Sequence, residues 1–185
     1  MNYSALERNV IEVMEEQQAK LGFDGNAVYL FYPVDSVAAM LDVPAQEETL
    51  TEALKGFCGH IKDKLGEVSC IIREGRVTFV VSAQGGEYVK GRLNDRSFIV
   101  RLIAMVSSHA ASADGVIALF REYSDKVCVR KMPENEEFDY LVYFEDGEPD
   151  AFLYCLKEEM GHVTYHRFTK ADFEAFRFDM TEADR

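Results

Sequence analysis

Two histidines four residues apart, His162 and His166, are the first candidates for chemistry in this sequence. On a helix this spacing would bring both rings to one metal ion, but the intervening Val-Thr-Tyr favours a strand. On a strand both side chains point to one face and lie ~13 Å apart along the axis, which is too far for one metal ion. Val163 also stands where a His-Glu-x-x-His site requires glutamate. Two exposed polar histidines are the simplest interpretation, and the functional one is a face at which His162, Thr164 and His166 meet a partner.

A cluster of carboxylates follows the most aromatic stretch of the chain, at Glu145, Asp146, Glu148 and Asp150. Paired carboxylates can act as acid and base when burial separates their pKa values, and they can bind calcium. The alternating Asp/Asn pattern of a calcium loop is absent, however, and Asp-Gly and Pro are residues that turns favour in their own right. The cluster therefore predicts a solvated hairpin tip.

The stretch 82–92, Ser-Ala-Gln-Gly-Gly-Glu-Tyr-Val-Lys-Gly-Arg, is predicted to be a glycine-bearing loop. It fails the P-loop pattern, because Arg92-Leu93 stands where Lys and Ser/Thr are required. Exposed glycine amides before a helix N-terminus would still suit an anion, although a turn with surface charges is the simpler interpretation. If an anionic small molecule binds this chain, the expected contacts are Gly85, Gly86, Lys90, Arg92 and Arg96.

The sequence names no catalytic residue and implies no cofactor. A Gly-x-Ser-x-Gly elbow, a dinucleotide-binding fingerprint and a cysteine-protease context are all missing. The cysteines lack metal-chelating or Cys-x-x-Cys spacing, so they are predicted to be reduced core residues and to hold no zinc or iron. They are Cys58, Cys70, Cys128 and Cys155.

Charge and hydropathy narrow the partners and the location. The formal net charge is -13, which repels nucleic acid and acidic membrane surfaces. No apolar run approaches the ~20 residues that span a bilayer, and the N-terminal segment lacks the pattern of a signal peptide. The sequence therefore predicts a cytoplasmic protein with no nucleic-acid or membrane partner.

The order of periodic segments predicts an α+β fold. Helical spacing marks residues 4–22 and 50–65 and the stretches near 96–109 and 116–123, while residues 34–41 are either a short helix or an irregular connector. We expect one domain over 1–185, with a helical part over 1–66 and a sheet-containing part over 67–178. The sheet is expected to be antiparallel, with a central hairpin over 67–82, a C-terminal meander over 126–168 and helices mainly on one face.

The meander also carries a resemblance. Phe-Asp-Tyr-Leu-Val-Tyr-Phe-Glu-Asp-Gly at 138–147 and Gly-His-Val-Thr-Tyr-His-Arg-Phe-Thr at 161–169 resemble an uncharacterised family from anaerobic Gram-positive bacteria. The opening amphipathic helix and Gly-Gly-Glu-Tyr-Val at 85–89 are similar too, so the likeness covers most of the chain. The family is a domain of unknown function. The resemblance implies a bacterial cytosolic protein and supplies no catalytic residue.

Two function classes follow from these observations. The favoured one is a non-enzymatic domain that binds a protein partner or associates with itself, because aromatic residues are plentiful and catalytic motifs are lacking. Its anchors would be Tyr143, Tyr154 and Tyr165, beside the His162, Thr164 and His166 face. The alternative is a small hydrolase built from His109, His162 or His166 and a carboxylate such as Glu145. An enzyme should show a deep pocket with a histidine–carboxylate pair, whereas a binding protein should show a flat or grooved aromatic patch.

Overall fold

The chain forms two compact units, residues 1–94 and 95–185, in a computed structural model that describes residues 3–109, 111–133 and 136–175. The predicted α+β class is confirmed, since helices accompany two antiparallel sheets of three and four strands. That the units act as one domain stays a prediction. Among the residues that the structure describes, no helix is both long and apolar enough to cross a bilayer.

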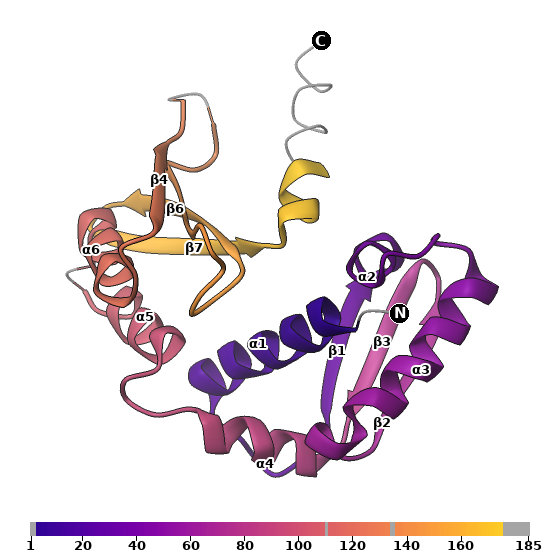
Figure 1. Ribbon diagram of the computed structural model, residues 1–185. Coiled ribbons are helices and arrows are strands. Elements are labelled where there is room, and N and C mark those ends of the chain that lie inside the picture. The colour runs from indigo at the N-terminus through magenta and orange to yellow at the C-terminus, as the bar shows by residue number, and fades with distance from the viewer. Residues whose placement is uncertain (1–2, 110, 134–135, 176–185) are drawn as a thin grey trace. The chain divides into compact units, whose positions relative to one another are not determined.

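The first unit builds a three-stranded antiparallel sheet in the order β1-β3-β2 (Figure 1). The hairpin predicted over 67–82 therefore pairs with β1, and the prediction that it shares a sheet with the C-terminal meander is wrong. The two antiparallel registers place the buried residues of all three strands on one face. The elements are α1 (Ser4–Leu21), β1 (Val28–Pro33), α2 (Val34–Leu41), α3 (Glu47–Leu65), β2 (Val68–Arg73), β3 (Arg76–Val81) and α4 (Ala83–Arg92).

The core of the first unit lies between one face of this sheet and its helices. Every second residue of β3 is buried, as the alternation of a half-covered strand requires. The rings of Phe57 on α3 and Phe79 on β3 meet edge to face, with centroids 5.7 Å apart. The fully buried side chains from α1 and α3 include Leu6, Val10, Met14, Leu50, Leu54, Phe57, Ile61 and Leu65.

Residues 83–92 form helix α4, so the loop predicted for this stretch is wrong. Its two adjacent glycines allow close packing rather than a chain reversal. A Cβ on Gly85 would lie 2.4 Å from Val81 Cγ1 and 2.7 Å from the Leu65 carbonyl oxygen. A Cβ on Gly86 would lie 2.2 Å from the Phe23 ring.

The second unit carries the four-stranded sheet in the sequential order β4-β5-β6-β7. All three pairings are antiparallel, which confirms the predicted meander. Residues 170–175 begin a further helix, and Thr169 caps it by accepting a hydrogen bond from the Asp172 backbone at 3.1 Å. The elements are α5 (Phe98–Val106), α6 (Ala113–Tyr123), β4 (Val127–Lys131), β5 (Tyr140–Phe144), β6 (Leu153–Glu159) and β7 (His162–Phe168).

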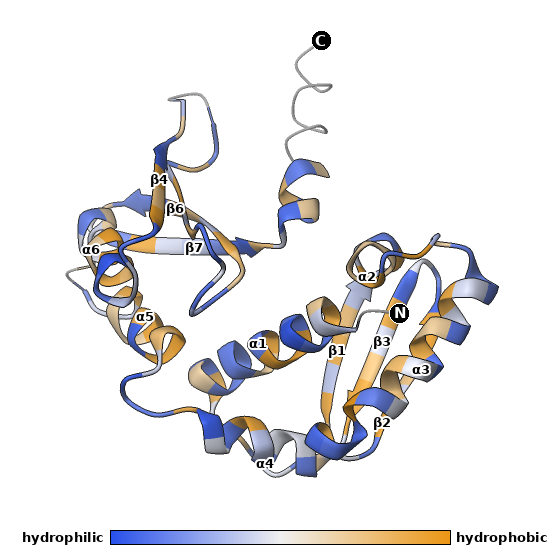
Figure 2. Ribbon diagram, viewed as in Figure 1, coloured by the Kyte–Doolittle hydropathy of each residue, from blue (hydrophilic) through white to orange (hydrophobic). Residues whose placement is uncertain are grey.

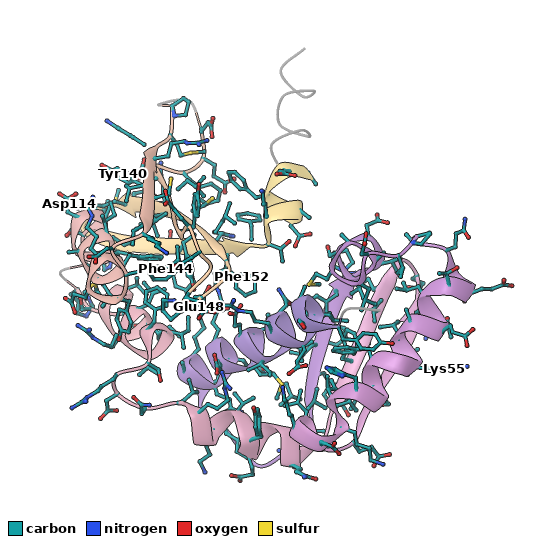
Figure 3. All side chains as sticks on the ribbon, in the orientation of Figure 1. Lys55, Asp114, Tyr140, Phe144, Glu148 and Phe152 are labelled. Atoms are coloured by element: carbon teal, nitrogen blue, oxygen red, sulfur yellow. The ribbon has the colours of Figure 1, made fainter. Side chains whose placement is uncertain are left out.

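Both faces of this second sheet carry buried residues. On one face, Phe98 of α5 and Phe120 of α6 pack against Phe144 and Tyr154 of the sheet. Figure 3 labels Phe144 among the side chains of this unit. Leu141 and Cys155, which alternate with those strand residues, belong to a smaller cluster with Phe138 and other apolar residues. The apolar run of β5 is therefore buried on both sides.

Asp150 is buried in the second unit, so the prediction of a solvated turn is wrong at this position. Its carboxylate accepts hydrogen bonds from the Phe152 backbone at 2.9 Å and from the Tyr154 hydroxyl at 2.9 Å. Arg167 donates to it at 3.0 Å, and the guanidinium lies 3.9 Å from the centre of the Phe152 ring. The side chains of Asp150 and Arg167 are only 7% and 5% exposed, so burial makes this ion pair a structural element of the unit.

Candidate interaction surface

The sheet face of the first unit that turns away from the helices exposes large apolar side chains. Tyr29 and Phe31 on β1 are 58% and 63% exposed, and Ile71 on β2 is 60% exposed. The register places Phe31 and Ile71 on either side of Thr78 in one cross-strand row, and Tyr29 lies two residues before Phe31 on the same face of β1. Figure 2 shows apolar residues along β1 and β3. Exposed apolar side chains that are neighbours on one face are typical of interaction surfaces.

The outer edge of β1 offers backbone hydrogen-bonding groups. Val34 donates its amide to the Gly75 carbonyl at 3.0 Å, which continues the β1–β3 ladder by one pair. Because bonded pairs alternate in an antiparallel ladder, Val28, Leu30 and Tyr32 bond to β3. The N–H and C=O groups of Tyr29 and Phe31 therefore point outward. In the described part of the chain, β1 has β3 as its neighbour and no strand on its other side.

A groove of about 400 Å³ runs between this edge and helix α1. Tyr29, Leu30 and Phe31 form the strand wall. Glu16 and Lys20 on the helix wall are joined by an ion pair at 2.8 Å, so their charges offset each other. The residues that line the helix wall are Val13, Glu16, Gln17, Lys20 and Leu21.

This combination of an edge strand beside a helix suits the addition of an extended peptide. A peptide strand would bond to the outward backbone groups, and its alternate side chains would enter the groove or contact the open face. Proteins usually protect such an edge with charged residues or bulges, because it can pair with other chains. Between Val28 and Tyr32 the strand has no charge, and only Pro33 at its end limits pairing.

The sequence contains strand β1 but does not identify its exposed face. Residues 28–32, Val-Tyr-Leu-Phe-Tyr, are apolar or aromatic at both odd and even positions, so the pattern does not show which face of the strand is exposed. The signal that could have indicated a surface is the absence of polar residues from the face opposite the core. A strand covered on both sides gives the same pattern, and only the packing of the helices separates the two cases.

The predicted partner face on β7 is exposed. His162, Thr164 and His166 all lie on the surface of the same strand. The ring of His162 lies 6.0 Å from that of His109, and the ring of His166 lies 5.3 Å from that of Phe138. That this face binds a partner stays a prediction.

The three tyrosines proposed as anchors are not equivalent. Tyr143 and Tyr165 are half-buried, but Tyr154 is fully buried, with its hydroxyl bonded to Asp150. Tyr154 cannot contact a partner without unfolding of the core, so its assignment as a surface anchor is wrong. The anchor role of the other two tyrosines stays a prediction.

The residues predicted to contact an anion have other partners. The backbone amides of Gly85 and Gly86 both donate to the Ser82 carbonyl, at 2.9 and 3.3 Å. Arg92 pairs with Glu15 at 2.8 Å, and Lys90 lies 5.8 Å from the centre of the Phe23 ring. Arg96 belongs to the second unit. Anion binding stays a prediction, but the exposed glycine loop that motivated it is absent from this described segment.

A histidine–carboxylate contact occurs at a position that the sequence did not indicate. His60 Nε2 on α3 lies 2.8 Å from Glu7 Oε2 on α1, and Lys64 donates to the other oxygen of Glu7. Burial raises the pKa of Glu7, but the hydrogen bonds with Lys64 and His60 outweigh burial and hold the pKa below its usual value. The side chain of His60 is 45% exposed, so this pair lies on the surface rather than in a deep pocket.

The Glu7 contact predicts a pH dependence of stability. A carboxyl whose pKa is lower in the folded state stabilises the fold above its unfolded value of 4.5, and loses this effect as pH falls through the folded value. We expect Glu7→Gln to lower the free energy of unfolding by about 0.5 kcal/mol at neutral pH, as exposed pairs do. Urea unfolding at a series of pH values should show this difference closing below pH 4.5. A difference in the free energy of unfolding that persists at acidic pH, or an equal difference for the exposed Glu48→Gln control, would contradict a stabilising role for the Glu7 carboxylate.

Metal ligation has no support among the described residues. Across residues 3–109, 111–133 and 136–175, no group of three or more His, Cys, Asp or Glu side chains is arranged to hold a metal ion. His162 and His166 share a strand, as the sequence predicts, and two histidines at that separation do not meet at one ion.

Comparison with known proteins identifies the family. The chain belongs to the family described as "Domain of unknown function, E. rectale Gene description (DUF3877)", whose model matches residues 3–177. This match confirms the resemblance to an uncharacterised family of anaerobic Gram-positive bacteria. The searches of curated proteins and of solved structures returned no match. The family description states no activity, so a proposal about function depends on the geometry above.

Proposed function

We propose that this chain is a non-enzymatic, cytoplasmic protein-binding domain, and that its first unit takes an extended segment of a partner protein along the outer edge of β1. The observation that carries the proposal is the outward direction of the Tyr29 and Phe31 backbone groups beside the groove of α1. Two exposed aromatic side chains accompany these groups. Four free cysteines are consistent with a reducing compartment.

The geometry defines the chemistry of the partner segment. Pro33 has no N–H, so the edge offers two amide donors, from Tyr29 and Phe31, and the partner pairs over a short stretch. Side chains on one face of a strand recur every second residue. The partner should therefore carry apolar side chains at positions i and i+2, which contact Tyr29 and Phe31, and no proline at the residues that pair with them.

A second copy of this chain is a weaker candidate for the occupant. The four exposed apolar side chains Leu21, Tyr29, Phe31 and Ile71 present on the order of 500 Å², below the ~800 Å² per partner of a standard interface. The net charge of -13 also repels a second copy. An extended peptide adds main-chain hydrogen bonds to a small apolar contact, and therefore needs less area.

Selection from a library of random peptides tests this proposal. The full chain is immobilised, and peptides long enough for one strand, about 6 residues, are enriched on it. We expect enriched peptides to share apolar residues at i and i+2. Phe31→Glu should weaken their binding at least ~10-fold, because it places a charge in the apolar contact. The matched control is Met160→Glu, which makes the same kind of change at an exposed methionine in the β6–β7 turn.

A second pair of variants separates the contribution of backbone hydrogen bonds to peptide binding from that of the Tyr29 side chain. Tyr29→Ala removes the ring, and Tyr29→Pro removes both the ring and the outward N–H without affecting a bond to β3. Strand addition predicts that Tyr29→Pro weakens binding more than Tyr29→Ala. Equal loss in both variants, selected peptides without the alternating pattern, or dimerisation abolished by Phe31→Glu would contradict the peptide proposal.

A further inference from the structure

Cys58 and Cys70 are brought together by the fold, although they lie on different elements. Cys58 is on α3, and Cys70 is on β2, the strand against which α3 packs. Cys70 alternates with the exposed Ser69 and Ile71, so its side chain lies on the helix-covered face. Both thiols are half-buried and pack against the core of the first unit. This position leaves part of each side chain within reach of a small molecule.

The two thiols share a hydrogen bond, and this bond makes them unequal. It raises the pKa of Cys58, an effect that burial reinforces. The same bond lowers the pKa of Cys70 to about 7, and burial opposes it. Cys58 is therefore the donor and Cys70 the acceptor. A thiolate is the reactive form of cysteine, so Cys70 is the nucleophile of the pair and Cys58 is positioned to react with it.

The other two cysteines serve as internal comparisons. Cys155 is fully buried, and burial raises its pKa to about 12, so it is a structural core residue as the sequence predicts. Cys128 on β4 is half-buried and hydrogen-bonds with the side chain of Tyr143 rather than with a second thiol. In the described part of the chain, Cys58 and Cys70 thus differ from both in having a thiol partner.

We propose that Cys58 and Cys70 are a redox-active pair, which a small hydroperoxide oxidises to an intramolecular disulfide linking α3 to β2. The carrying observation is the contact between two half-buried thiols on α3 and β2, two elements that pack together, with both thiols against the core of the first unit. Closing the bond requires the two sulfur atoms to move from this contact to about 2.05 Å. The proposal is independent of peptide binding at β1.

The reaction balances with hydrogen peroxide as the oxidant. The Cys70 thiolate attacks one peroxide oxygen, the O–O bond breaks, and the departing hydroxide takes a proton to become water, which leaves a sulfenic acid on Cys70. Cys58 sulfur then attacks the Cys70 sulfur, the S–O bond breaks, and the hydroxide leaves as water with the Cys58 proton. Two thiols lose two electrons, and the peroxide is reduced to two molecules of water. An added thiol such as dithiothreitol reduces the disulfide back to two thiols by exchange.

Peptide mapping of the full chain tests this proposal without a substitution. Reduced protein is treated with hydrogen peroxide, quenched, digested and analysed by mass spectrometry without reduction. We expect a linked peptide pair containing Cys58 and Cys70, loss of these two thiols before those of Cys128 and Cys155, and full recovery with dithiothreitol. A different linkage, earlier oxidation of Cys128, or thiol loss without the Cys58–Cys70 link would overturn the proposal.

Two variants assign the roles within the pair. Cys58→Ser should leave a Cys70 sulfenic acid that a dimedone probe traps, because no resolving thiol remains. Cys70→Ser should slow oxidation of Cys58 at least ~10-fold, because the thiolate of lower pKa is gone. Cys128→Ser is the matched control and should leave the rate of linkage unchanged. Equal rates in Cys70→Ser and in the parent would overturn the assignment of Cys70 as the nucleophile.

Discussion

Replacing Asp150 with alanine is expected to destabilise the second unit by about 3–5 kcal/mol, because it removes the carboxylate partner of a buried guanidinium. The Tyr154 hydroxyl and the Phe152 amide lose an acceptor in the same variant. The chain contains no Trp, so intrinsic tryptophan fluorescence cannot follow unfolding. Urea unfolding monitored by NMR signals from each unit would measure the loss where it occurs.

Two control variants test whether the loss of stability comes from the buried ion pair of Asp150. Asp146→Ala changes an exposed carboxylate in the same turn, whose pair with Lys126 at 3.3 Å is on the surface, and should destabilise the unit far less than Asp150→Ala. Asp150→Asn keeps the shape and an acceptor oxygen, and should fall between the two alanine variants. If Asp150→Ala cost no more than Asp146→Ala, the buried ion pair would not be a structural element.

Substitutions of two glycines in α4 are expected to have opposite signs. Gly85→Ala should destabilise the first unit by about 1–3 kcal/mol, because the new methyl group overpacks a filled site. The carbonyl oxygen of Leu65, 2.7 Å from that methyl position, is backbone and cannot rotate away. Gly91→Ala has no atom within 4 Å of its Cβ and should stabilise the helix by about 0.5 kcal/mol.

The same unfolding measurement, read on signals of the first unit, compares these two variants directly. Both changes remove the flexibility of glycine from the unfolded chain, so the difference between them isolates packing in the folded state. If residues 82–92 were the loop that the sequence favoured, both substitutions would have small effects. A stabilising Gly85→Ala would contradict the close approach of α4 to Leu65 and Val81.

Local patterns in the sequence predicted much of the secondary structure. Gly66 ends α3 with a φ of 69°, where the helix pattern places a terminal glycine. The meander is antiparallel because its turns are too short for a crossover. The start of α3 was less accurate: the helix begins at Glu47, whereas the helical spacing of the sequence marks its start at residue 50. Helix ends carry weaker signals than the apolar stripe that drives packing.

Relations between distant residues were harder to predict. The aromatic and apolar residues of β1 favour a strand but do not select β3 as its neighbour, so the sequence led us to expect one sheet where the chain forms two. Adjacent glycines fit a loop and a closely packed helix equally well. The close approach of Val81 to Gly85 and of Phe23 to Gly86 is what requires glycine at these two positions of the helix. Contacts such as Cys58 with Cys70 join residues on separate elements, so spacing along the chain carries no signal for them.

Amide hydrogen exchange along β1 is the most direct test of the central claim, that the outer edge of this strand binds an extended segment. In the unbound chain, the amides of Leu30 and Tyr32 should exchange slowly, since they bond to β3, whereas those of Tyr29 and Phe31 should exchange fast. Addition of a peptide selected on the full chain should slow exchange at Tyr29 and Phe31. Slow exchange of these two amides before any peptide is added, or unchanged fast exchange when the peptide is bound, would contradict the account.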